Sequence, residues 1–93
     1  MSDSGDNRRV VRIANRQGLH ARPAAEFVRL AKTFTAEIFV TKEELEVNGK
    51  SILGLMMLAA EFGAELTIRA DGPDAVAAIE RLCLLIVDGF GEG

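Results

Sequence analysis

The chain has 93 residues, of which 48% are hydrophobic, 27% charged and 5% aromatic, and it contains no Trp or Tyr. This length suffices for one domain with a modest core, and the composition excludes a disordered chain. Because aromatic residues are scarce, a stacking platform for single-stranded nucleic acid is not expected, and neither is a nucleic-acid partner.

The net charge of −3 is distributed unevenly along the chain. Residues 1–32 hold seven basic and three acidic side chains, whereas residues 33–93 hold four basic and eleven acidic ones. The excess of basic side chains in residues 1–32 is compatible with binding of an acidic partner or a phosphate. An unevenly charged, solvated surface explains the same excess. The one cysteine, Cys83, lies in an apolar run, which favours a buried free thiol. No signal-peptide pattern or membrane-length apolar run is present, which predicts a cytoplasmic protein without membrane insertion.

The first predicted elements are a tail, a strand and a helix. Residues 1–8 are polar and are expected to form a flexible tail, and residues 9–15 predict a half-buried strand with Val11 and Ile13 inside. Gly18 ends that strand. From Ala21 the apolar period becomes helical, and the predicted buried stripe consists of Ala24, Phe27, Val28 and Ala31.

Two strands and a second helix follow. Residues 35–42 and 44–49 alternate between apolar and polar side chains, which predicts a hairpin with its turn at residues 42–44. The inner positions predicted for these strands are Ala36, Ile38, Val40, Leu45 and Val47. Residues 51–60 predict a helix that is apolar nearly all round, with Ser51 at its N-cap.

The last third predicts a strand and a final helix. Residues 63–72 form a strand between two glycines, with Leu66 and Ile68 inside. Residues 73–88 form a helix that ends at Gly89, and residues 89–93 are expected to be loose. The buried stripe predicted for this helix consists of Val76, Ile79, Leu82, Cys83 and Ile86.

The element order is therefore β-α-β-β-α-β-α within one domain spanning residues 1–93. It predicts an α+β fold with the helices on one face of a mostly antiparallel sheet.

The only histidine, His20, lies directly before the predicted first helix in the segment GLHARPAA. Unpaired amide N–H groups and the positive end of the helix dipole favour an anion beside this ring. Arg22 supplies a charge-assisted contact to phosphate oxygens, and Pro23 fits the rigid first turn. These parts suit a phosphorylated imidazole, although a loop that binds an anion without a covalent bond needs nearly the same residues.

Two segments, GLHARPAAEFV and VNGKSILGLMMLAA, resemble the HPr family, the histidine-containing phosphocarriers of the bacterial phosphoenolpyruvate-dependent phosphotransferase system. The resemblance covers the chain from about Val10 to Val87. It implies an open-faced β-sandwich of four antiparallel strands under three helices. It also implies that His20 receives a phosphoryl group on Nδ1 from Enzyme I and passes it to sugar-specific IIA components, with Arg22 contacting the phosphate.

Ser51 has two interpretations. Serine is a good helix N-cap by itself. The resemblance adds that the serine of this Lys-Ser segment is a regulatory phosphorylation site for HPr kinase/phosphorylase in many bacteria. A phosphate there places negative charge beside the surface that docks Enzyme I.

The apolar run at residues 52–58 is either a helix buried on most sides or a docking surface to which methionine gives adaptability. The resemblance favours docking and implies the partner-facing residues Ala25, Arg29, Lys32, Ile52, Leu53 and Met56. Met57 departs from the small residue typical of several family members at this position.

The resulting prediction is a monomeric carrier and co-catalyst, not a free-standing enzyme, without a metal or organic cofactor of its own. Three alternatives stay open: a regulatory paralogue that acts through docking alone, a carrier of the nitrogen-related branch, and a domain that binds an anion without a covalent bond. The presence of His20 disfavours the first, because family members that only regulate can lack this histidine.

Overall fold

Four strands form one antiparallel sheet in the computed structural model, which describes residues 7–92. The strands are β1 (Arg8–Arg12), β2 (Glu37–Lys42), β3 (Leu45–Asn48) and β4 (Glu65–Asp71), in the spatial order β1-β4-β2-β3. In the register of the sheet, Val11 pairs with Leu66 and Val40 pairs with Ile68. Apolar residues of neighbouring strands are thus brought together on the inner face, as the alternating pattern predicts.

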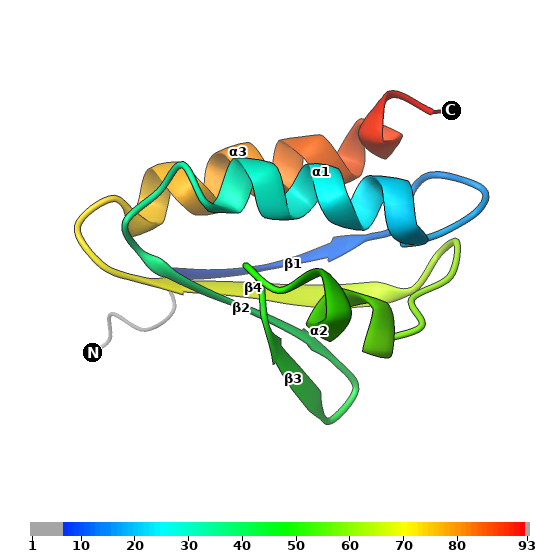
Figure 1. Ribbon diagram of the computed structural model, residues 1–93, viewed down its shortest axis with the longest axis horizontal. Coiled ribbons are helices and arrows are strands. Elements are labelled where there is room, and N and C mark those ends of the chain that lie inside the picture. Colours follow the sequence, from blue (N-terminus) through cyan, green and yellow to red (C-terminus); the bar gives the residue numbers. More distant parts are fainter. Residues whose placement is uncertain (1–6, 93) are drawn as a thin grey trace.

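The helices cover one face of this sheet. The helices α1 (Ala21–Ala31) and α3 (Ala75–Val87) lie side by side across it, and the short α2 (Ile52–Met57) lies against β3 and α1 (Figure 1). A 3-10 turn, η2 (Gly89–Gly91), follows α3 directly. The predicted α+β class, the element order and the open-faced arrangement are confirmed. No helix within residues 7–92 is long and apolar enough to cross a membrane.

The core lies between the sheet and α1 and α3. The predicted stripe of α1 is buried throughout, and so are the inner positions of β2 and β4. The largest side chains with almost no exposed surface are Phe27, Ile13, Ile38, Leu55, Leu66, Ile68, Leu82 and Ile86. Burial of these groups is the main stabilising contribution to the fold.

Two predicted core residues are wrong. Leu45 is exposed because it pairs with Lys42 at the tip of the β2–β3 hairpin. Val76 is 56% exposed and lies outside the buried face of α3, which keeps the other four predicted residues and adds Ala75 and Ala78.

The ends of several elements also differ from prediction. β1 ends at Arg12, although the amide of Ile13 still donates to the carbonyl of Ala64 at 2.9 Å. The helix predicted over residues 51–60 ends at Met57. Residues 1–6 of the predicted tail lie outside the described residues, as does Gly93, whereas Arg8 already pairs with Arg69 in the sheet.

The prediction of a loose C-terminus is wrong for residues 89–92. Gly89 has a φ of +68°, which ends α3 and turns the chain back toward the start of α1. Phe90 is only 5% exposed and belongs to the hydrophobic core. The C-terminal turn is therefore a packed part of the domain.

Candidate functional site

His20 is held by a tight loop between β1 and α1. Gly18 in this loop has a φ of +74°, and a Cβ there would lie 2.5 Å from the carbonyl oxygen of Ala60. Only glycine fits this conformation and this close approach. The next amide, that of Leu19, donates to the same carbonyl at 2.8 Å. The position of His20 is thus fixed against the segment that follows α2.

His20 is the N-cap residue of α1, as the sequence predicts. Its carbonyl accepts the first helical hydrogen bond, from the amide of Ala24 at 3.0 Å. The amides of Ala21 and Arg22 have no carbonyl one turn earlier, and the buried Pro23 has no N–H to leave unpaired. The free N–H groups and the positive end of the helix dipole therefore lie beside His20.

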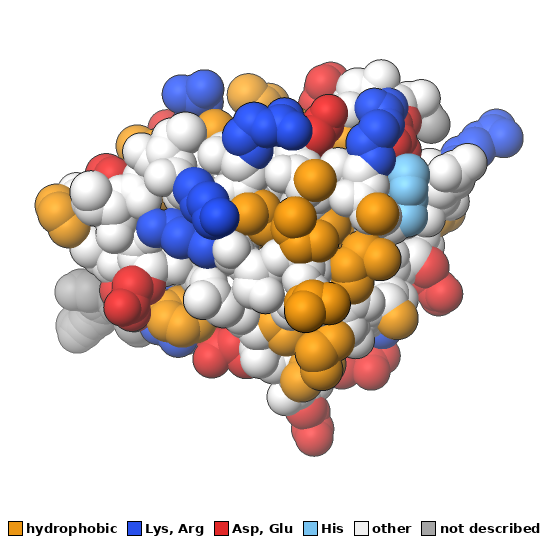
Figure 2. All heavy atoms as spheres, in the orientation of Figure 1, with side chains coloured by type: hydrophobic (Ala, Val, Ile, Leu, Met, Phe, Trp, Pro, Cys, Tyr) orange, Lys and Arg blue, Asp and Glu red, His pale blue; other side chains and the backbone are white. Residues whose placement is uncertain are grey.

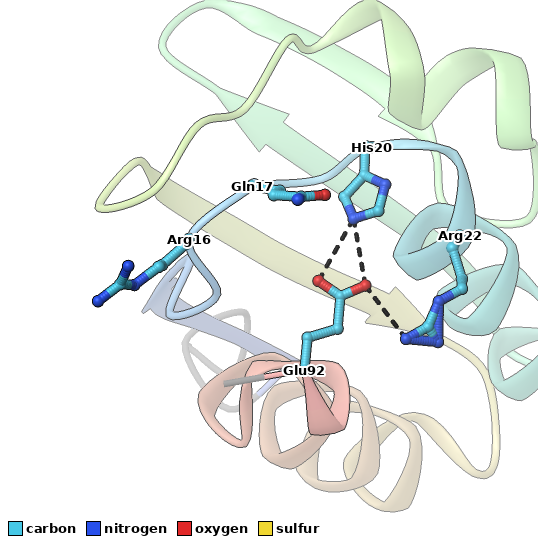
Figure 3. A pocket seen from close by; sticks show the side chains of 5 residues that line it. All are labelled: Arg16, Gln17, His20, Arg22 and Glu92. Atoms are coloured by element: carbon cyan, nitrogen blue, oxygen red, sulfur yellow. Dashed lines mark hydrogen bonds and ion pairs between the residues drawn. The ribbon is translucent and has the colours of Figure 1, made fainter.

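An open cavity of about 420 Å³ surrounds the imidazole (Figure 3). It is lined by Arg16, Gln17, His20, Arg22 and Glu92. The His20 side chain is 36% exposed and that of Arg22 is 62% exposed, so both are accessible from solvent. The structure brings together the two residues, His20 and Arg22, for which the sequence predicts contact with phosphate.

Glu92 adds a carboxylate to this site. Its Oε2 lies 3.1 Å from Nε2 of His20 and 3.5 Å from Nη2 of Arg22, and its side chain is only 15% exposed. Desolvation of Glu92 opposes ionisation, but hydrogen bonds from His20 and Asn15 and the positive charges nearby outweigh it. The pKa of Glu92 is therefore lowered from its ordinary value of 4.5. At neutral pH the group is a carboxylate.

Ser51 is the N-cap of α2, and its Oγ accepts a hydrogen bond from the amide of Gly54 at 3.0 Å. The N-cap interpretation is confirmed by this bond. Ser51 is half-buried and directly precedes the exposed residues of α2.

The helix α2 is not buried on most sides. Within it only Leu55 is buried, and four large apolar side chains are exposed: Ile52 at 44%, Leu53 at 77%, Met56 at 40% and Met57 at 66%. Figure 2 shows apolar side chains gathered beside the histidine, with Lys and Arg side chains next to them. We call this set of four residues the α2 patch.

The neighbouring helix α1 presents a basic stripe to the same surface. Arg22, Ala25, Arg29 and Lys32 follow one another at helical spacing, and all except the half-buried Ala25 are exposed. Because α1 and α2 are in contact, the stripe and the α2 patch form one continuous surface next to His20.

The sequence did not reveal four of the residues around His20: Asn15, Arg16, Gln17 and Glu92. Arg16 and Gln17 belong to the loop that the sequence placed between two elements. The large apolar Phe90 between two glycines was the one local sign that the C-terminal segment is anchored. Within residues 7–92, no group of three or more His, Cys, Asp or Glu side chains is placed to hold a metal ion.

These features define an open-faced β-sandwich domain that carries an accessible histidine at the N-terminus of its first helix. The family model described as the phosphorylation site of the HPr component of the phosphotransferase system matches residues 7–88. The chain therefore belongs to the HPr family of the phosphotransferase system.

Individual relatives agree with this assignment. The phosphocarrier protein HPr of Neisseria meningitidis serogroup A is 47% identical over 83 residues, which cover 89% of this chain and 93% of the relative. The crystal structure of HPr-C-His from Thermoanaerobacter tengcongensis is 43% identical and has a TM-score of 0.89, covering 92% of this chain and 97% of that one. The structure titled HPr dimer from the same organism is 45% identical with a TM-score of 0.75, covering 88% and 94%. Other relatives carry the names HPr-like protein Crh and phosphocarrier protein NPr.

Proposed function

We propose that the chain is a phosphocarrier whose His20 accepts a phosphoryl group on Nδ1 from phosphorylated Enzyme I and passes it to IIA components for sugar uptake. The observation that carries this proposal is the orientation of the imidazole. Its Nε2 faces Glu92, whereas Nδ1 has no hydrogen-bond partner among residues 7–92 (Figure 3). The accessible nitrogen is thus the one that would act as the nucleophile.

The transfer is an in-line displacement at phosphorus. The lone pair of Nδ1 forms the new N–P bond while the bond from phosphorus to the donor breaks, and its electron pair stays with the donor. Transfer to the next protein reverses these roles at His20. Such reactions depend mainly on positioning and on compensation of charge, which a small domain can share with its partners. The chain therefore acts as a carrier and co-catalyst.

Arg22 is the proposed phosphate ligand of this chain. Its guanidinium lies at the rim of the cavity and is 62% exposed, and among residues 7–92 it forms one ion pair, with Glu92 at 3.5 Å. A side chain held this weakly can turn toward a phosphoryl group, to which a guanidinium donates charge-assisted hydrogen bonds. Pro23 keeps the first turn of α1 rigid, so that the amides of the helix start stay directed at the same group.

The α2 patch and the basic stripe of α1 are the proposed docking surface for Enzyme I and the IIA components. The partner-facing residues in this proposal are Ala25, Arg29, Lys32, Ile52, Leu53 and Met56. An exposed apolar cluster next to the reacting residue suits repeated binding and release, and the basic side chains suit acidic partner surfaces.

Ser51 is the proposed regulatory site. A phosphate on its Oγ would sit at the start of α2, where it costs the fold little, but it would place negative charge directly before Ile52 and Leu53. We expect it to weaken transfer from Enzyme I. An ATP-dependent HPr kinase/phosphorylase would be the enzyme that adds it.

The carrier is proposed to work as a cytoplasmic monomer, without a resident cofactor, because Mg²⁺ would belong to Enzyme I. Size-exclusion chromatography with light scattering tests the monomer, and the dimeric relative makes that measurement informative.

The decisive experiment is incubation with phosphoenolpyruvate, Mg²⁺ and Enzyme I, followed by a test for acid-labile phosphate. We expect one labelled histidine in the wild type, none in His20→Ala, and slower labelling in Arg22→Ala with an unchanged melting temperature. An unlabelled wild type, or full label in His20→Ala, would contradict the proposal and favour a protein that acts by docking alone. Phosphoryl transfer to a nitrogen-branch IIA component, but not to sugar-specific ones, would assign the chain to that branch.

A further inference from the structure

The C-terminal turn brings Glu92 to His20 across 72 positions of sequence. Gly89, Phe90 and Gly91 all have φ values between +55° and +74°, which folds the chain back on itself. Phe90 anchors the turn in the core, and the amide of Glu92 donates to the carbonyl of Gly89 at 2.8 Å. The carboxylate is therefore presented to the site by a fixed backbone. It lies beyond residues 7–88, which the family model matches.

A buried amide fixes the carboxylate a second time. Asn15 has no exposed surface, and its Nδ2 donates to the carbonyl of Gly18 at 2.7 Å and to Oε1 of Glu92 at 3.0 Å. The opposite orientation of the amide would set its oxygen against two acceptors, so the donor assignment follows from the contacts. Asn15 thus ties Glu92 to the same loop that positions His20.

This arrangement determines which nitrogen of the imidazole carries the proton. Both oxygens of Glu92 lie within hydrogen-bond distance of Nε2, at 3.1 and 3.3 Å. An ionised carboxylate only accepts hydrogen bonds, so Nε2 must donate. In the neutral ring the lone pair is then on Nδ1, on the far side of the ring from Glu92 (Figure 3).

We propose that Glu92 is a positioning residue for phosphoryl transfer, holding His20 in the tautomer whose Nδ1 is free to attack. The inference rests on the proposed function of His20. As the N–P bond forms, the proton stays on Nε2 and the ring gains positive charge, which the carboxylate compensates at 3.1 Å. When the phosphoryl group leaves for the next acceptor, the ring returns to the same neutral tautomer.

Glu92 also forms an ion pair with Arg22 while no phosphoryl group is present. The 3.5 Å contact between them joins a carboxylate and an exposed guanidinium. A phosphoryl group on Nδ1 carries more negative charge and draws Arg22 away, whereas the bond between Glu92 and Nε2 persists. The carboxylate thus keeps Arg22 near the site without binding it tightly.

The test compares Glu92→Gln and Glu92→Ala with the wild type and with Glu80→Gln. Glu80 is an exposed residue of α3, so this variant removes the same charge away from His20. Nitrogen-15 NMR of the unphosphorylated proteins, recorded on the neutral imidazole, reports which ring nitrogen carries the proton. We expect the wild type and Glu80→Gln to show a protonated Nε2, and both Glu92 variants to show a mixture of tautomers.

The second readout is single-turnover transfer from phosphorylated Enzyme I. We expect the rate at saturation to fall about five- to tenfold in the Glu92 variants, with binding unchanged, because a partly exposed charge-assisted hydrogen bond is lost. An unchanged tautomer in Glu92→Ala, or a changed tautomer with an unchanged rate, would overturn the positioning role. If the wild type accepts no phosphoryl group from Enzyme I, the proposed carrier function is overturned. The NMR tautomer of the wild type would still show whether Glu92 accepts the hydrogen bond from Nε2.

Discussion

Leu53→Ala should weaken docking of Enzyme I without destabilising the domain. Leu53 is the most exposed residue of the α2 patch, at 77%. Full burial of a leucine contributes about 1.5–3 kcal/mol, so a partner that covers the exposed part gains about 1–2 kcal/mol. Truncation should therefore raise KM for this chain about 5- to 30-fold, since 1.36 kcal/mol corresponds to a factor of ten.

The measurement is steady-state transfer from Enzyme I at increasing concentrations of the carrier. Because Leu53 binds the partner equally before and during transfer, kcat should stay unchanged while KM rises. Leu84→Ala is the matched control: Leu84 is 65% exposed but lies on α3. Both variants should melt at the wild-type temperature. If Leu53→Ala leaves KM unchanged, or Leu84→Ala raises it equally, the α2 patch is not the docking surface.

Three further outcomes are expected. Ser51→Ala should lose the N-cap hydrogen bond from the amide of Gly54, which lowers the free energy of unfolding by about 1 kcal/mol. Calorimetry should then show a Tm about 4–8 °C lower than that of the wild type. An unchanged Tm would show that this bond does not stabilise the domain. The pKa of Asp74 is lowered from 3.8, first by the hydrogen bond from the amide of Thr35, so its stabilising contribution is complete above pH 3.8 and is lost as pH falls through the folded pKa. In chemical unfolding, the free energy of unfolding of Asp74→Asn should therefore lie below that of the wild type above pH 3.8, and the difference should shrink as the pH falls below this value. A difference that does not change with pH contradicts this linkage. Burial raises the pKa of the Cys83 thiol above 9.0, and the positive charge of Arg9 opposes this only in part. Iodoacetamide should therefore label Cys83 slowly at about pH 8 in the native protein and fast in urea. Equal labelling rates would show that the thiol is accessible in the native protein.

The sequence predicted well those elements whose hydrophobic pattern is compatible with only one buried face. On α1, apolar residues recur along a single stripe with charged residues off it, so the buried face follows from the period alone. The alternation in β2 and β4 is equally unambiguous, and the inner positions Val40 and Ile68 are fully buried. Local spacing also predicted the N-cap positions of His20 and Ser51, because a helix start depends on only a few adjacent residues.

The pattern on α3 has more than one solution. This helix is apolar around most of its circumference, so its period does not discriminate between the predicted Val76 and the small residues Ala75 and Ala78. The chain buries the two alanines, and Val76 falls on an exposed stripe with Leu84 and Val87. Periodicity placed Ile79, Leu82, Cys83 and Ile86 correctly in the core, but it did not fix the edge of the buried face at the start of the helix.

Glu92, the hydrogen-bond partner of His20, could not be predicted from the local sequence pattern for a different reason. Composition describes residues 88–93 as glycine-rich and acidic, which is typical of a loose end. The order of residues 89–92 depends on the burial of Phe90 and on the hydrogen bond from Asn15 to Glu92, and both contacts exist only once the fold is formed. The sequence thus identified His20 as the proposed phosphate acceptor, whereas Glu92, the group proposed to select its reactive nitrogen, required the three-dimensional structure. For the same reason, a C-terminal truncation or tag that displaces residues 89–92 removes a carboxylate from the site and is not a neutral change to this protein.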